Sequence, residues 1–214
     1  MEPLNFELYR PSDLELWIQD KFQGDGLNLP GDLEDWDRIA ALFGAHIAYT
    51  EGETKVMYDE DGDCLIFLNI HMDKLQQKLA FFHELSHPAL HAGNQLQMPS
   101  SFVALQETQA GLFQLYSAMP LHMLRAFAHL QQQPHDLRLV AEAFDVPLSF
   151  ARRRLDRIAG RIRQEHEDRR LRARLADRSS LGQDSAYSEL TSRLLHQLYQ
   201  QTRNASPKKG SIRP

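Results

Sequence analysis

The sequence predicts an α+β fold: a mostly helical core with a small antiparallel β-sheet, followed by a helical C-terminal segment. Apolar residues recur at helical spacing early in the chain and again from residue 73 onward. Between these stretches, residues 46–69 contain short apolar runs separated by turn residues, as the strands of hairpins do. The 214 residues are 42% hydrophobic and 25% charged, which is typical of a globular protein with a buried core.

The first part of the chain predicts two packing helices. Ser12 or Asp13 can cap a helix over residues 13–23, whose Leu, Trp, Ile and Phe side chains lie at helical spacing. A second helix is predicted over residues 32–43, and Gly44 stands where a C-cap glycine belongs. Neither helix carries a combination of residues that indicates a catalytic or binding role.

Three short strands are expected next, over residues 46–49, 54–58 and 63–69. The dipeptide Asp61-Gly62 between the last two strands predicts a hairpin turn, because glycine tolerates positive φ. We expect the edge of this sheet, along either the second or the third strand, to accept an extended segment of a partner as an added strand.

The helix that follows contains the pattern His-Glu-x-x-His. Asp73 is its expected N-cap, with Gln76 in the matching capping-box position. His83 and His87 are spaced i to i+4, so they lie on one face and can hold one metal ion, while Glu84 lies beside it. A solvated helix with the same residues is the competing interpretation, but the position on a predicted amphipathic helix favours a metal site.

A catalytic zinc site usually has three protein ligands, so a third ligand is required. His91 and His122 are candidates, but Pro88 disfavours continued helix and should kink or end it just after the second histidine. We favour Glu107, which lies on the predicted helix 102–119, on its inner face among small residues. Small residues there would let two helix backbones approach closely.

Charge is divided unevenly along the chain. Residues 1–149 carry 8 Lys and Arg against 22 Asp and Glu, and residues 150–214 carry 16 against 7. The basic part begins within residues 139–158, which predict helix, short turn and helix, and continues through a charged helix over 161–178. A last amphipathic helix is expected over residues 187–199, before a polar tail.

These observations divide the chain into a core over residues 1–130, a helical and helix-turn-helix-like region over 131–200, and a disordered tail over 201–214. The start of the chain lacks the basic and apolar segments of a secretory signal, and no apolar run is long enough to span a membrane. Cys64 is the only cysteine, which excludes an internal disulfide. We therefore expect a cytoplasmic protein without a membrane partner.

Two stretches resemble the ImmA/IrrE family of zinc metallopeptidases: FFHELSHPALHAG and QETQAGLFQLYSAMP. The later run VAEAFDVPLSFARRRL is similar to the element that follows the family's catalytic core. The chain differs from the usual pattern at Ser86, at Pro88 and in the stretch that begins at Gln109. The resemblance implies a zincin-like core over residues 1–130, with Zn²⁺ held by His83, His87 and Glu107 and with Glu84 as the catalytic base.

The resemblance also implies a function: a zinc-dependent endopeptidase that cleaves a protein substrate, most simply a helix-turn-helix transcriptional repressor. The alternative is a non-catalytic regulator, such as a toxin–antitoxin or phage component, that binds a repressor or DNA through its basic C-terminal region. We expect a protein substrate more than DNA, because charge runs usually form solvated faces.

Overall fold

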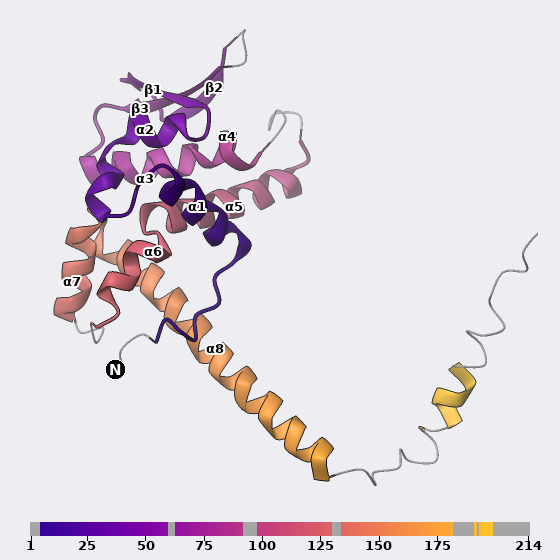
Figure 1. Cartoon of the computed structure of the whole chain (residues 1–214). Helices are drawn as coiled ribbons and strands as arrows, with labels where there is room; N and C mark the ends of the chain where they lie inside the picture. The colour runs from indigo at the N-terminus through magenta and orange to yellow at the C-terminus, as the bar shows by residue number, and fades with distance from the viewer. Residues whose placement is uncertain are drawn as a thin grey trace, which may run out of the picture. The chain divides into compact units, whose positions relative to one another are not determined.

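The computed structural model describes residues 5–59, 63–91, 98–129, 134–181, 191 and 193–198 (Figure 1). Its internal contacts divide the chain into two units, Met1–Glu167 and Asp168–Pro214. The first unit contains the whole sheet and most helices, and the second contains the end of the longest helix. The predicted α+β class, with a helical C-terminal part, is confirmed.

The elements follow one another in an order close to that predicted. The described helices and strands are α1 (Asp13–Gly24), η1 (Pro30–Glu34), α2 (Trp36–Ala41), β1 (Ala45–Thr50), β2 (Lys55–Tyr58), β3 (Cys64–Asn69), α3 (Lys74–Glu84), α4 (Ser86–Leu90), α5 (Ser100–Ala118), α6 (Leu121–Leu124), η3 (Arg125–Phe127), α7 (Pro134–Ala143) and α8 (Leu148–Leu181).

Of the two helices predicted at the start of the chain, the first is present as one helix and the second is divided. Of the two predicted caps, Ser12 caps α1, and it does so through a complete capping box with Glu15 that the sequence analysis did not identify. The helix predicted over residues 32–43 is instead divided into η1 and α2. The division occurs at Asp35, whose side chain accepts a hydrogen bond from the Arg38 backbone N–H at 3.1 Å and so caps a new helix inside the predicted one.

The sheet is mixed, whereas the sequence predicted antiparallel pairing throughout. Among the described residues its strand order is β1-β3-β2, with β3 antiparallel to β2 but parallel to β1. Residues 51–54 cross the end of β3, where the Asn69 side chain donates to the Gly52 carbonyl at 2.7 Å and the Asn69 backbone N–H donates to Thr54 Oγ1 at 3.0 Å. The predicted turn at 61–62 lies outside the described residues.

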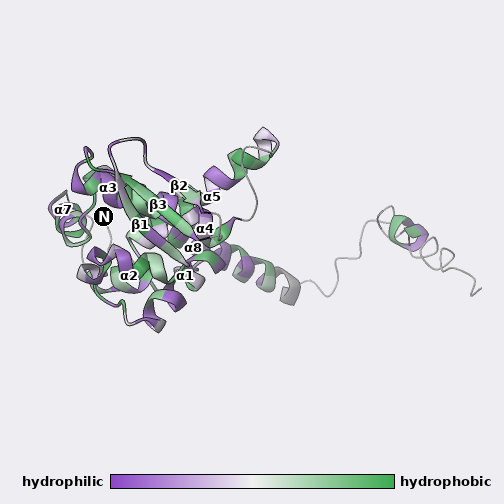
Figure 2. Ribbon diagram, turned by 90° about the horizontal axis from the view of Figure 1, so that it is seen from above, coloured by the Kyte–Doolittle hydropathy of each residue, from purple (hydrophilic) through white to green (hydrophobic). Residues whose placement is uncertain are grey.

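The core lies between the sheet and the helices. The side chains of Cys64, Ile66 and Leu68 are buried along one face of β3, and α3 packs on this strand. Figure 2 shows hydrophobic residues concentrated in β3 and in parts of the neighbouring helices, with hydrophilic residues on α7. Phe81 and Phe82 of α3 are fully buried in the same cluster, and Phe81 stacks on Trp36 with ring centroids 5.7 Å apart.

The helical C-terminal region begins with α7 and α8. The predicted turn at residues 145–147 is present, and the helices predicted on either side of residue 160 form one continuous helix, α8. Residues 191 and 193–198 of the last predicted helix are helical, while the rest of it and the predicted tail lie outside the described residues. None of the described helices combines the length and the apolar composition that a membrane span requires.

A buried ionic cluster joins the two ends of the first unit. Glu15 of α1 accepts hydrogen bonds from the Tyr9 hydroxyl at 2.6 Å and from Arg154 of α8 at 2.8 Å, and both charged side chains are almost completely buried. Arg161 of α8 also contacts Glu15, at 3.0 Å. This cluster anchors α8 to the helix that opens the fold.

Candidate metal centre

Helix α3 carries the first two residues of the site at its C-terminal end. Asp73 and Gln76 form the predicted capping box at its start, and its buried phenylalanines fix which face points into the core. His83 and Glu84 therefore project from the last turn, at the border of the core. The His83 side chain is 30% exposed.

The helix is interrupted at Leu85, before the second histidine. We expected Pro88 to cause a kink or an end just after His87; instead α3 ends at Glu84 and α4 resumes at Ser86. Proline has no N–H to donate to the Glu84 carbonyl, so the regular bonding pattern fails one turn upstream of it. The buried Ser86 hydroxyl donates to the His83 carbonyl at 2.6 Å, which ties the two helices together across the interruption.

Helix α5 supplies the third residue. It packs on both α3 and α4, and the Gln114 side chain donates to the Leu79 carbonyl of α3 at 2.8 Å, which fixes the two helices against each other. The expectation that Glu107 lies on a buried face is wrong, because its side chain is 45% exposed. Gly111 is not needed for close packing either, since an added Cβ would meet no atom within 4 Å.

The structure brings His83, His87 and Glu107 close together. Their ligand atoms all lie within 4.8 Å of one another, and they form a group in the described chain that could hold a metal ion. Glu107 lies 3.2 Å from His83 Nε2 through one oxygen and 4.0 Å from His87 Nε2 through the other. Zinc–ligand bonds of ordinary length at tetrahedral angles place ligand atoms about 3.4 Å apart, between these two distances.

The electrostatics of the site suit a cation. Burial lowers the pKa of His87, although Glu107 acts in the opposite direction, so the imidazole is neutral at neutral pH and its ring nitrogen can bind a metal. Burial, together with the negative charge of Glu107, raises the pKa of Glu84 to about 7. A buried carboxylate and an adjacent carboxylate both favour the binding of a positive charge between the helices.

The edge of the sheet lies beside this site. A hydrogen bond from the Val56 backbone N–H to Glu84 partly offsets the rise in that residue's pKa. Val56 belongs to β2, an outer strand of the sheet, whereas β3 is paired on both sides. Of the two strands that the sequence left open as partner-binding edges, the structure thus excludes β3 and leaves β2.

The other candidate histidines occupy different positions. His122 Nε2 lies 3.0 Å from the Leu27 carbonyl, so it packs against the loop after α1. His91 ends α4 with an extended backbone, and its ring centroid lies 5.5 Å from that of His87, but it is not part of the cluster of three ligand atoms. Sequence reasoning did not find the supporting bonds made by Gln114 and Ser86, or the contact of Val56. The Gln114 and Val56 contacts depend on residues far apart in the chain.

The chain is similar to several known proteins in structure and in sequence. Among solved structures, a Mycobacterium tuberculosis transcriptional regulator aligns with a TM-score of 0.46 and 17% sequence identity, over 66% of this chain and 46% of its own. The chain therefore spans less than half of that protein.

Two Bacillus subtilis (strain 168) proteins are similar in sequence. Phage-like element PBSX protein XkdA is 33% identical over 146 residues, which is 68% of this chain and 72% of the relative. The uncharacterized protein YqaB is 27% identical over 147 residues, covering 69% and 84%. Residues 40–156, more than half of the chain, match the model of the Peptidase_M78 family, described as the IrrE N-terminal-like domain. By this match and the likeness to XkdA, the chain belongs to the Peptidase_M78 metallopeptidase family.

Proposed function

We propose that the protein is a zinc-dependent endopeptidase. The observation that carries the proposal is the convergence of His83, His87 and Glu107 within 4.8 Å, with the buried Glu84 next to the first ligand. Two imidazoles and one carboxylate form a ligand set that catalytic zinc sites use, and this set leaves one position open. Family membership implies a metal, and the donor atoms present fit zinc.

Glu84 is the proposed general base. When bound, a zinc ion acts as a Lewis acid that lowers the pKa of water toward neutrality and polarises a substrate carbonyl. A positive charge at the three ligands favours the ionised form of Glu84, whose pKa without that charge is about 7. The carboxylate can then take a proton from the attacking water and deliver it to the leaving amine.

The outer edge of β2 is the proposed binding site for the substrate backbone. The strand has one unpaired side, and the contact between Val56 and Glu84 places it beside the proposed base. An extended segment added along β2 would bring its peptide bonds past Glu84. Met57 and Tyr58 on this strand are 45% and 54% exposed, so they can contact substrate side chains.

A protein substrate of the helix-turn-helix repressor type fits the family resemblance. The likeness to a phage-like element protein supports a role in a mobile element, where cleavage of a repressor would release genes from repression. We therefore expect the substrate to be a repressor encoded beside this gene.

The test combines metal analysis with cleavage. The purified protein, its Glu84→Gln and His83→Ala variants, and a Glu142→Gln control at an exposed glutamate are incubated with the neighbouring repressor. Metal content is measured by mass spectrometry, and products by their intact masses. The His83 variant should lose zinc and cleavage together, the Glu84 variant should keep zinc and lose cleavage, and the control should keep both. Normal cleavage by the Glu84 variant would refute the mechanism.

A further inference from the structure

We propose that the outer face of the sheet, on the side away from α3, is a docking surface for an amphipathic helix of the protein substrate. This face lies next to the β2 edge, so it would hold one part of the substrate while the metal centre cleaves another. The inference rests on the proposed function for the identity of the partner, and it adds the kind of substrate surface that the enzyme recognises.

The register of the three strands places six side chains in two rows on this face. Side chains alternate between the two faces along a strand, so the residues between the buried Cys64, Ile66 and Leu68 point outward, as do their partners on β1 and β2. The two rows, each in the order β1, β3, β2, are His46, Leu65 and Met57, and then Ala48, Phe67 and Lys55. Leu65 and Phe67 form the centre of the outer face, with a neighbour on both sides.

The described core does not cover the centre of this face. Leu65 and Phe67 are partly exposed, and neither belongs to the core cluster or to the apolar residues that pack against it. Met57 beside them is 45% exposed. Figure 1 shows the sheet at the top with α3 below it, and the view from above in Figure 2 shows the hydrophobic colour of β3. The outer face therefore presents apolar side chains at the surface.

The width of the outer face matches one helix. Adjacent strands lie about 4.8 Å apart, so the backbones of β1 and β2 are about 10 Å apart. A helix with its side chains has a diameter of about 10–12 Å. Helix α3 already packs on the other face of β3, so a helix from a partner would complete a helix–sheet–helix arrangement of the kind that buries both faces of a sheet.

The outer face is too small to hold a partner alone, which disfavours a second copy of the chain. It offers six side chains, whereas each partner of a stable complex contributes about 20–30 residues. It can instead add to a contact made beside it. The proposed binding of the substrate backbone along β2 is such a contact, because Met57 and Lys55 of the outer face belong to this strand. A substrate is therefore the occupant that the position favours.

The charges of the outer face select an acidic helix. Lys55 is exposed, and the ion pairs among the described residues do not include it. Residues 1–149 carry 22 Asp and Glu against 8 Lys and Arg, yet neither row contains an acidic side chain. The matching helix has apolar residues at positions i, i+3 or i+4, and i+7 that contact Leu65 and Phe67, and an Asp or Glu that pairs with Lys55.

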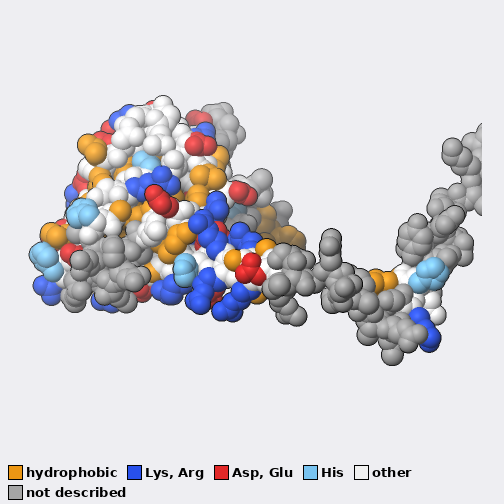
Figure 3. Space-filling model, turned by 60° about the horizontal axis from the view of Figure 1, so that its bottom comes forward, with side chains coloured by type: hydrophobic (Ala, Val, Ile, Leu, Met, Phe, Trp, Pro, Cys, Tyr) orange, Lys and Arg blue, Asp and Glu red, His pale blue; other side chains and the backbone are white. Residues whose placement is uncertain are grey.

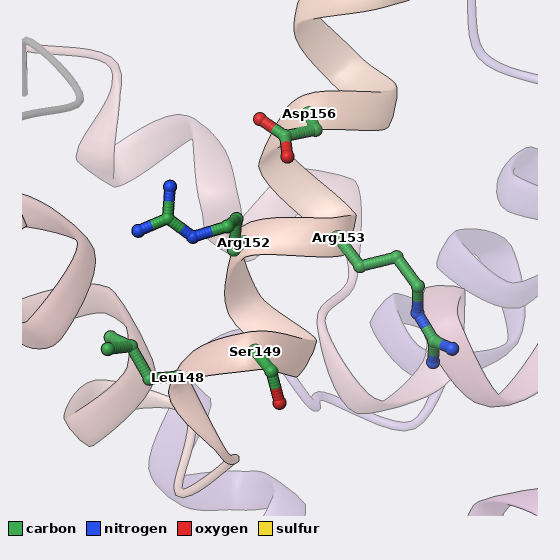
Figure 4. A pocket seen from close by; sticks show the side chains of 5 residues that line it. All are labelled: Leu148, Ser149, Arg152, Arg153 and Asp156. Atoms are coloured by element: carbon green, nitrogen blue, oxygen red, sulfur yellow. The ribbon is translucent and has the colours of Figure 1, made fainter.

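An anionic membrane or a nucleic acid is a poorer match, because the basic side chains gather elsewhere. Figure 3, in which the bottom of the molecule comes forward, shows Lys and Arg side chains along the lower part of that view. The hollow on α8 belongs to another surface, and its Arg152 and Arg153 point to different sides of the helix (Figure 4). The outer face has one lysine and an apolar centre, which suits a protein helix.

The first experiment measures binding without cleavage. The full-length Glu84→Gln protein is titrated with the repressor encoded beside the gene, by isothermal titration calorimetry. Adding Leu65→Thr and Phe67→Thr should weaken binding at least about ten-fold, because apolar contact area is lost while threonine remains compatible with a strand. The matched control is Tyr49→Thr, which removes an aromatic side chain that is 61% exposed but points to the other face as the partner of Leu68. The control should stay within about two-fold.

Two single variants test the same face at exposed positions. Met57→Gln should weaken binding about three-fold, and it decides the question if the double variant is not folded by circular dichroism. Lys55→Glu should weaken binding about five-fold at 50 mM salt and less than about two-fold at 500 mM, because salt screens the pairing of Lys55 with an acidic helix.

The second experiment separates docking from catalysis. With Glu84 restored, the Leu65→Thr/Phe67→Thr variant should raise KM for the whole repressor about ten-fold and leave kcat unchanged, since the lost contacts lie outside the reacting atoms. It should cleave a short peptide that spans the cleaved bond at the wild-type rate. If the repressor binds through the outer face but wild type does not cleave it, the docking stands and the peptidase proposal fails. If the double variant cleaves the repressor as wild type does, the docking fails and the peptidase proposal stands.

Other outcomes would also overturn the docking proposal. These are no binding of the repressor, an equal loss of affinity in the Tyr49→Thr control, slower cleavage of the short peptide by the double variant, and displacement of the repressor by vesicles of phosphatidylserine and phosphatidylcholine. Light scattering provides the last comparison: a wild-type dimer that the double variant converts to a monomer would assign the outer face to a second copy of the chain.

Discussion

The buried pair of Glu15 and Arg154 provides the sharpest test of the fold. The two side chains are 1% and 0% exposed, and Arg154 also donates to the Met119 carbonyl at 3.1 Å and lies over the Tyr116 ring. Glu15→Gln keeps the shape of the side chain but leaves the buried guanidinium without its carboxylate. Removing one partner of a buried pair costs about 3–5 kcal/mol, and the remaining contacts of Arg154 favour the lower end.

A loss of about 3 kcal/mol lowers the melting temperature of a protein of this size by about 6–12 °C. The assay is thermal and urea unfolding at pH 7, with Glu142→Gln as the exposed control. Arg154→Met and the double variant complete a cycle, in which the double variant should be less destabilised than the sum of the two single variants by about 2 kcal/mol. If Glu15→Gln changed the free energy of unfolding by less than about 0.5 kcal/mol, the pair would not stabilise the fold, because exposed substitutions have effects of that size.

The same pair predicts a dependence on pH. Burial raises the pKa of Glu15, but Arg154 and the hydrogen bonds from Tyr9 and Ser12 outweigh it, so the pKa is lower than the usual 4.5. A lowered pKa in the folded state stabilises the fold above pH 4.5, and this stability is lost as pH falls through the lowered value. The stability difference between wild type and Glu15→Gln should be constant from pH 6 to 8 and shrink below pH 4.5.

Three further predictions concern the metal centre. Glu84→Gln should reduce cleavage by about 10²–10⁴-fold, the usual contribution of a general base, while zinc content stays unchanged; an equal loss of zinc would indicate a ligand role instead. Removal of the metal with a chelator should lower the melting temperature of the wild type, because a ligand that binds only the folded state stabilises that state. The chelator should leave the melting temperature of His83→Ala unchanged. Differential scanning fluorimetry measures both temperatures. Gln114→Leu should lower the free energy of unfolding by about 1 kcal/mol and weaken zinc affinity in competition titrations, because it removes the hydrogen bond that joins α5 to the Leu79 carbonyl. An unchanged zinc affinity would show that Gln114 does not position the metal ligands.

Local signals in the sequence were sufficient for most helix starts. Asp73 and Gln76 form the predicted capping box, and Ser12, one of the two predicted caps of the first helix, caps α1. The interruption at Asp35 was missed because an internal aspartate looks like an ordinary polar residue in an amphipathic pattern. In the structure Pro30 begins a separate 3-10 turn, and Asp35, which follows that turn, caps α2 through the Arg38 backbone N–H.

Local pattern predicted only part of the pairing in the sheet: the antiparallel pair of β2 and β3 is present as predicted, whereas the parallel pair of β1 and β3 was not expected. The sequence predicted a small sheet that is antiparallel throughout, without a strand order. The structure inserts β3 between β1 and β2, and the bonds of Asn69 to Gly52 and Thr54 hold the crossing chain. A strand order of this kind depends on which long-range pairing buries the apolar face best, and alternation along each strand does not encode it.

The motif of the metal centre follows from the sequence alone, because helical spacing places His83 and His87 on one face wherever the helix lies. Which acid meets them depends on the packing of helices: Glu107 faces the histidines, with its carboxylate half exposed, because α5 packs on α3 and α4. It also decided that β2, rather than β3, is the open edge beside Glu84. Contacts within one helix follow from its fixed rise per residue, whereas contacts between elements depend on how the whole core packs.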